Sequence, residues 1–123
     1  CLAVVLVCGL SSLGAAWFLS PEIQDIGLCG LSGIDHGLMA VVTLTMAKDR
    51  STRWLGLWGF ALLAAKVVFE TVAGDALFSS LYLGMCGIPL VACHLGGVLG
   101  GLVAWALFAP GFGLRTGKAA WIR

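Results

Sequence analysis

The sequence predicts an all-α membrane protein. Of its 123 residues, 60% are hydrophobic and only 11% are charged, whereas soluble domains carry roughly 25% charged residues. A chain of this length cannot bury so much apolar surface inside a water-soluble core. In lipid the backbone must satisfy its own hydrogen bonds, so apolar segments of spanning length predict helices. The net charge of +1 does not bear on a nucleic-acid partner, but no basic run is long enough to follow a phosphate backbone, so no such partner is predicted.

Four apolar segments approach the roughly 20 residues that a helix needs to cross a bilayer. They are residues 1–19, 28–47, 54–72 and 88–109. Pro21, Pro89 and Pro110 lie at or near the segment ends, where the missing N–H of proline is tolerated. The segments therefore predict four transmembrane helices.

The basic residues orient these helices. Of the 7 Lys and Arg residues, all but Lys66 lie in the 48–53 loop or in the tail from Arg115 onward. The positive-inside rule makes that side cytoplasmic. Segments 28–47 and 88–109 then both run inward from the outer face. At about 1.5 Å per residue, Ser32 and His94 lie at a similar depth, on the order of 10 Å below the outer surface.

Ser32 and His94 form the candidate functional pair, because polar groups left in hydrocarbon are costly and mark functional sites. Small residues follow both at helical spacing: Gly33 and Gly37 near Ser32, Gly97 and Gly101 after His94, and Gly96 and Gly100 beside them. Such residues let helix backbones approach closely, and proton transfer needs about 2.6–3.2 Å between heavy atoms. Ordinary membrane packing is the other interpretation of the glycines.

Two motifs carry a family resemblance. Gly30-Leu31-Ser32-Gly33 resembles the GxSG motif of rhomboid intramembrane serine proteases, and residues 94–101 (HLGGVLGG) resemble their HxxGxxxG motif. In that family one helix separates the serine helix from the histidine helix, as it does here, and the resemblance covers about residues 27–109. With His36, residues 30–37 (GLSGIDHG) look most like the rhombosortase branch.

The resemblance implies a rhomboid-like helical bundle and a serine endopeptidase. Residues 1–123 would form one transmembrane domain that holds the last four spans of a six-helix fold. Its place would be the bacterial cytoplasmic membrane, with the site toward the outer face. Substrates would be transmembrane or C-terminal sorting segments of exported proteins. The His and Asn that the family uses in an HxxxN arrangement are absent from this sequence and are expected upstream of Cys1. The alternative function is a non-catalytic relative that binds membrane segments.

The expected chemistry is that of a Ser-His dyad. Ser32 would be the nucleophile and His94 the general base, since a serine hydroxyl needs a base to take its proton. The Ser32 N–H, near a helix start, is a candidate donor to the oxyanion. No carboxylate is expected near enough to complete a triad. Lys66 and Glu70 are one turn apart and are expected to pair and snorkel toward the outer surface.

Several residues keep more than one interpretation. His36 could stack on or hydrogen-bond His94, act as the base itself, or be purely structural. Asp35 could hold a histidine, line a water path or be merely solvated. The loop at residues 74–87 is either an amphipathic cap over the site or an ordinary connector.

No cofactor or metal is predicted, because the sequence has no CxxC or zinc-type ligand spacing. Haem ligation by His36 and His94 is a third hypothesis, but it leaves the GxSG motif unexplained. One disulfide among Cys29, Cys86 and Cys93 is compatible with an oxidising outer side. Apolar packing is the default interpretation of the cysteines.

Overall fold

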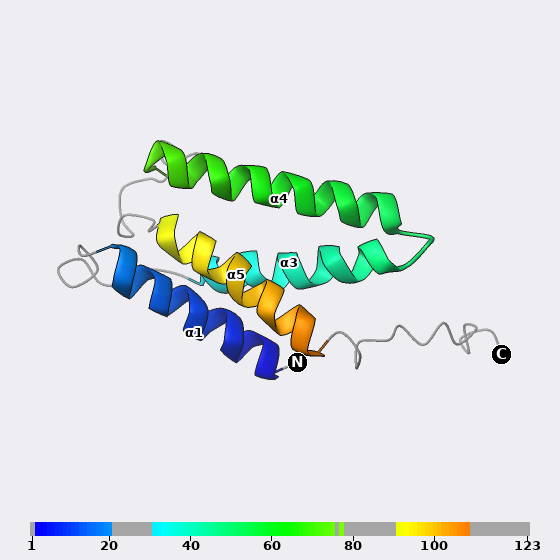
Figure 1. The fold of residues 1–123 in the computed structure, drawn as a ribbon, viewed down its shortest axis with the longest axis horizontal. Coiled ribbons are helices and arrows are strands. Elements are labelled where there is room, and N and C mark those ends of the chain that lie inside the picture. The colour runs from blue at the N-terminus through cyan, green and yellow to red at the C-terminus, as the bar shows by residue number, and fades with distance from the viewer. Residues whose placement is uncertain (1, 21–30, 76, 78–90, 109–123) are drawn as a thin grey trace.

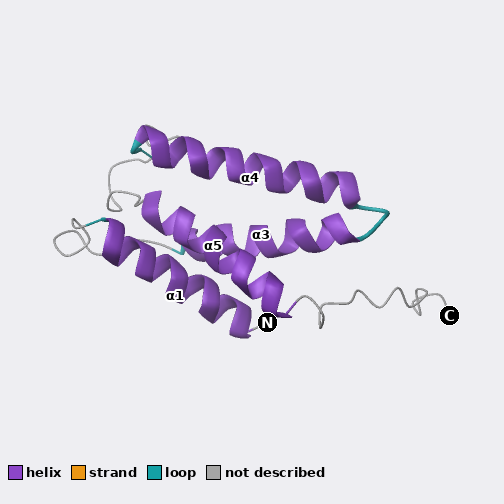
Figure 2. Ribbon diagram, viewed as in Figure 1, coloured by secondary structure: helices purple, strands orange, loops and turns teal. Residues whose placement is uncertain are grey.

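The computed structural model describes residues 2–20, 31–75, 77 and 91–108. This part of the chain is entirely helical and contains no strand (Figures 1 and 2). The helices are α1 (Leu2–Leu19), α3 (Ser32–Lys48), α4 (Arg53–Ala73) and α5 (Val91–Phe108). The prediction of an all-α fold is confirmed for these residues.

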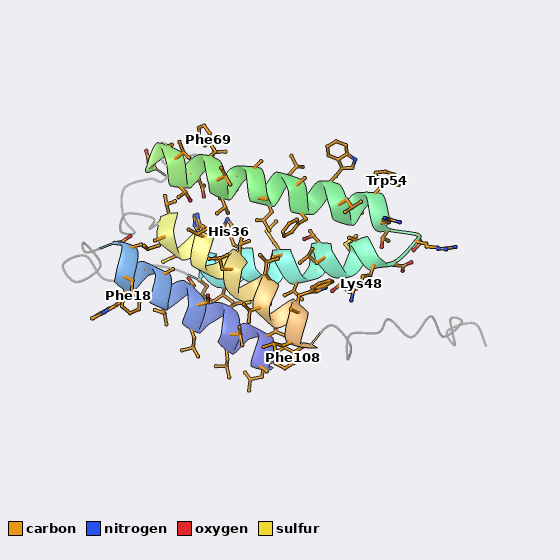
Figure 3. The ribbon with its side chains drawn as sticks, in the orientation of Figure 1. Phe18, His36, Lys48, Trp54, Phe69 and Phe108 are labelled. Carbon is orange, nitrogen blue, oxygen red and sulfur yellow. The ribbon has the colours of Figure 1, made fainter. Side chains whose placement is uncertain are left out.

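Three of the helices, α1, α4 and α5, are long and apolar enough to cross a membrane. The protein is therefore a membrane protein. Helix α3 has 17 residues, and the predicted second span began at Leu28, in residues outside the described part. That α3 crosses the bilayer stays a prediction. Apolar side chains such as Phe18, Trp54 and Phe69 point away from the bundle and are well exposed, as lipid-facing groups would be (Figure 3).

A tight polar turn joins α3 to α4. The Thr52 hydroxyl donates to the Met46 carbonyl (2.9 Å), and Asp49 Oδ1 accepts from the Ser51 N–H (3.0 Å). The first bond gives a second donor to a carbonyl in the last turn of α3, which also accepts from the Asp49 N–H, and the second bond closes the turn. At its other end, α4 stops at Gly74, whose φ of 72° places it in the left-handed region that glycine adopts at no steric cost.

Helix α5 is central and uses glycine on two faces. A Cβ on Gly97 or Gly101 would run into backbone carbonyls of α3. A Cβ on Gly96 or Gly100 would meet α1. Because only glycine lets the backbones come this close, α5 lies directly against both neighbours. The buried Ser12 hydroxyl adds a hydrogen bond from α1 to the Cys93 carbonyl of α5 (3.1 Å).

The directions of the helices bring three helix ends together. Helices α3 and α5 run the same way and α4 runs against them, so the start of α3, the end of α4 and the start of α5 share one end of the bundle (Figure 1). Buried Ala40, Leu63, Val67 and Val98 pack these three helices together. The basic α3–α4 turn lies at the opposite end.

Candidate functional site

Ser32 and His94 are in hydrogen-bonding contact. Ser32 is the first residue of α3 and His94 lies in the first turn of α5. The distance from Ser32 Oγ to His94 Nε2 is 3.2 Å. His94 is 4% exposed. The structure therefore brings together the two residues that the sequence placed at equal depth.

Glycine makes this approach possible. Gly33 follows Ser32 directly, and a Cβ at Gly33 would lie 2.7 Å from the Cys93 carbonyl oxygen. One turn below His94, a Cβ at Gly97 would run into the Gly33 carbonyl. Any larger residue at these positions would push α3 and α5 apart at the level of the pair. Gly30, the other glycine of the motif, lies outside the described residues.

A carboxylate also touches His94. Glu70, near the end of α4, accepts a hydrogen bond from His94 Nδ1 at Oε2 (2.7 Å). Its other oxygen, Oε1, accepts from the Lys66 ammonium (2.7 Å) and from the Leu77 backbone N–H (2.9 Å). The expectation that no carboxylate is well placed was therefore wrong. The Lys66–Glu70 pair forms as predicted, but Glu70 is 0% exposed and does not snorkel.

The sequence did contain a signal for Glu70. An ionisable residue in a membrane segment usually faces the bundle interior and marks a functional site. The i, i+4 spacing to Lys66 instead favoured a surface ion pair, because such pairs are common on exposed helix faces. Only the rotation of α4 about its axis separates these two interpretations, and local spacing does not determine it.

His36 stacks on His94. The ring centroids are 4.1 Å apart with an interplanar angle of 10°. His36 Nδ1 donates to the Ser32 carbonyl oxygen (2.6 Å), and His36 Nε2 accepts from Lys66 (2.9 Å). Figure 3 shows His36 lying between α4 and α5 in projection. Since both ring nitrogens have other partners, the geometry favours the stacking role over a role as base for Ser32.

The partners also assign the proton positions on both rings. A carbonyl oxygen only accepts and an ammonium only donates, so neutral His36 carries its proton on Nδ1. The Glu70 carboxylate only accepts, so His94 carries its proton on Nδ1 as well. The lone pair of His94 Nε2 then faces the Ser32 hydroxyl. This tautomer is the one that a general base for Ser32 requires.

His36, Glu70 and His94 offer metal-ligand atoms within 4.8 Å of one another, but their arrangement does not fit a metal. Imidazole lone pairs lie in the ring planes, and two parallel stacked rings cannot aim them at one ion. Lys66 also occupies the position of a cation between His36 and Glu70. The same stacking argues against bis-histidine haem ligation, in which the rings stand on opposite sides of the iron.

The remaining predicted residues stand as follows. Asp35 is exposed on the first turn of α3. Cys8 and Cys93 are buried free thiols, so Cys93 forms no disulfide; Cys29 and Cys86 lie outside the described residues. Of the predicted cap at residues 74–87, only positions 74, 75 and 77 are described, and Leu77 is bonded to Glu70.

Comparisons with protein-family models, with curated proteins and with solved structures give no match. What can be said of function therefore comes from the residues and their geometry.

Proposed function

We propose that this protein is an intramembrane serine endopeptidase of the rhomboid type. One observation carries the proposal: the Ser32 hydroxyl lies 3.2 Å from Nε2 of a buried His94, in a helical bundle of which three helices are long and apolar enough to cross a membrane. A nucleophile in hydrogen-bonding distance of an oriented base is the geometry of covalent acyl transfer. The GxSG and HxxGxxxG motifs support the same conclusion by resemblance.

The reaction would proceed through an acyl-enzyme. Ser32 Oγ attacks the scissile carbonyl carbon while its proton passes to His94 Nε2. His94 then gives that proton to the leaving amine nitrogen as the C–N bond breaks, which leaves the substrate acyl group on Ser32 as an ester. A water molecule attacks this ester, its proton goes to His94, and the carboxylic acid product departs with the proton returned to Ser32.

The start of α3 supplies donors to the developing oxyanion. The first intrahelical bond at this end runs from the Asp35 N–H to the Leu31 carbonyl. The amides of Ser32, Gly33 and Ile34 precede it, so they have no intrahelical acceptor. The Ser32 N–H in particular is near the oxygen of an acyl group attached to its own side chain, and amides of this kind stabilise tetrahedral intermediates.

The proposed substrates are transmembrane or C-terminal sorting segments of exported proteins. The proposed place is the bacterial cytoplasmic membrane, with the site toward the outer face. The basic turn between α3 and α4, with Lys48, Arg50 and Arg53, lies at the end of the bundle opposite the start of α3 (Figure 1). The positive-inside rule puts such a turn in the cytoplasm. The substrate class and the bacterial host rest on the rhombosortase resemblance.

A serine-directed probe tests the proposal. The protein in its membranes is treated with a fluorescent fluorophosphonate, and Ser32→Ala is compared with Ser51→Ala, which changes an exposed serine in the α3–α4 turn. We expect labelling of the wild type and of Ser51→Ala, and none of Ser32→Ala. Equal labelling of all three, or no labelling of the wild type, would overturn the assignment of Ser32 as nucleophile.

A further inference from the structure

Glu70 is a fully buried carboxylate on a helix that is otherwise largely apolar. Burial of a charged group in a low-dielectric interior costs several kcal/mol unless it is well paired. Leucine at this position would pack α4 without that cost. Helix packing alone therefore does not explain a carboxylate at this position. The three groups that donate hydrogen bonds to it indicate its role.

The two oxygens of Glu70 have separate partners. Oε1 accepts from Lys66 and from the Leu77 N–H. Those two donors fix the plane of the carboxylate. Oε2 is left with His94 Nδ1 at 2.7 Å, a length typical of a charge-assisted hydrogen bond. The chain Glu70–His94–Ser32 is therefore continuous, from carboxylate to imidazole to hydroxyl.

We propose that Glu70 is the positioning residue of the Ser32–His94 pair, and that Lys66 is its built-in counter-charge. Glu70 keeps the His94 proton on Nδ1, which leaves Nε2 free to take the serine proton. It also lies beside the imidazolium that forms when His94 takes that proton. The predicted dyad thus acts as a Ser-His-Glu triad. This inference rests on the proposed peptidase function.

Lys66 makes the buried carboxylate tolerable. Its ammonium bonds both Glu70 and His36, and its side chain is 32% exposed, so the charge also reaches solvent or headgroups. Because an ammonium has no lone pair, it also holds His36 in the tautomer that bonds the Ser32 carbonyl. Glu70, Lys66 and His36 therefore act on His94 from two sides, one through a hydrogen bond and the other through a stacked ring.

The test replaces the carboxylate by its neutral isostere. In Glu70→Gln the amide NH₂ can donate to His94 Nδ1 and favour the wrong tautomer. We expect the rate of fluorophosphonate labelling and kcat/KM to fall about 1,000-fold or more, as for carboxylate-to-amide changes in serine protease triads, with KM nearly unchanged. The matched control is Asp35→Asn, an exposed carboxylate on the same end of the bundle, which should behave like the wild type.

A spectroscopic readout keeps the proposal testable if Glu70→Gln does not fold. The ¹⁵N shifts of His94 in the wild-type protein report its tautomer, and we expect the Nδ1–H form. In the variant Lys66→Arg, which keeps the counter-charge, most activity should survive, whereas Lys66→Met should lose it. An Nε2–H tautomer in the wild type, or a folded Glu70→Gln variant within about threefold of wild-type activity, would overturn the role of Glu70.

The two proposals fail separately. If the wild-type protein shows no labelling that depends on Ser32, the proposed peptidase function is refuted, whatever the role of Glu70. Normal Ser32-dependent labelling in a folded Glu70→Gln variant refutes only the positioning role.

Discussion

Gly37→Ala is a remote test of the close approach of α3 and α5. Gly37 lies one turn after Gly33, and the atoms nearest to a Cβ placed there belong to Cys8 and Gly97. A Cβ there would lie 2.7 Å from the Gly97 carbonyl oxygen and 2.6 Å from Cys8 Sγ. Ordinary carbon–carbon contact begins near 3.5 Å, and contact with oxygen only slightly closer. The backbone of α5 must therefore move by about 0.7 Å, since a carbonyl oxygen cannot rotate away.

That displacement is large for the site. Added to the 3.2 Å between Ser32 Oγ and His94 Nε2, it takes the pair out of hydrogen-bonding range. A misplacement of about 1 Å can cost about 100-fold in rate. Overpacking of this kind also costs about 1–3 kcal/mol of stability. We expect Gly37→Ala to fold with a lowered Tm and to react with the fluorophosphonate probe about 30 to 100 times more slowly than the wild type.

The matched control is Gly14→Ala on α1, where a Cβ would meet nothing within 4 Å. Alanine in a helix interior is favoured over glycine by roughly 0.5–1 kcal/mol, so this variant should keep its activity, with a Tm that is unchanged or slightly raised. If Gly37→Ala reacts at the wild-type rate with an unchanged Tm, the reasoning from glycine contact to site geometry is refuted.

Two further predictions concern His36 and the orientation of the chain. His36→Phe keeps a flat ring against His94 and should retain substantial cleavage, measured as the initial rate on a membrane-segment substrate; complete loss in a folded variant would point to a direct proton role for His36. Because the chain has 5 native cysteines, Ser51→Cys is compared with the wild type: it should add no labelling by a membrane-impermeant maleimide in intact cells and add labelling once the membrane is opened, since the basic α3–α4 turn is proposed to be cytoplasmic. Labelling above the wild type in intact cells would reverse the proposed orientation.

Much of the fold could be predicted from the sequence because the length and apolar composition of a segment are enough to indicate a membrane helix. All four described helices fall within about three residues of the predicted segments, apart from the start of α3. The meeting of Ser32 and His94 was also foreseeable, since the charge pattern gave the two helices one direction and the glycines gave them a close crossing. Charge pattern and glycine spacing can both be determined from the order of residues along the chain, without knowledge of how the helices pack.

The Glu70–His94 contact could not be predicted in that way. It depends on which face α4 turns toward α5, and Lys66 and Glu70 have the same spacing whether they face lipid or the bundle. The role of His36 was likewise open, because a residue one turn after Ser32 can reach His94 only if α5 presents its histidine at that height. Both contacts are properties of the assembled helices.

The polar bonds of Glu70 and Lys66 also bear on how α4 finds its place. Lipid tails are as apolar as leucine, so burial of apolar surface gives a membrane helix little preference for one rotation over another. Bonds from Glu70 to α5 and from Lys66 to α3 are specific to a single rotational setting of α4. Glu70 and Lys66, which are proposed to position the proton on His94, therefore also fix the rotation of α4 in the bundle. The same hydrogen bonds would serve both the chemistry and the assembly of the helices.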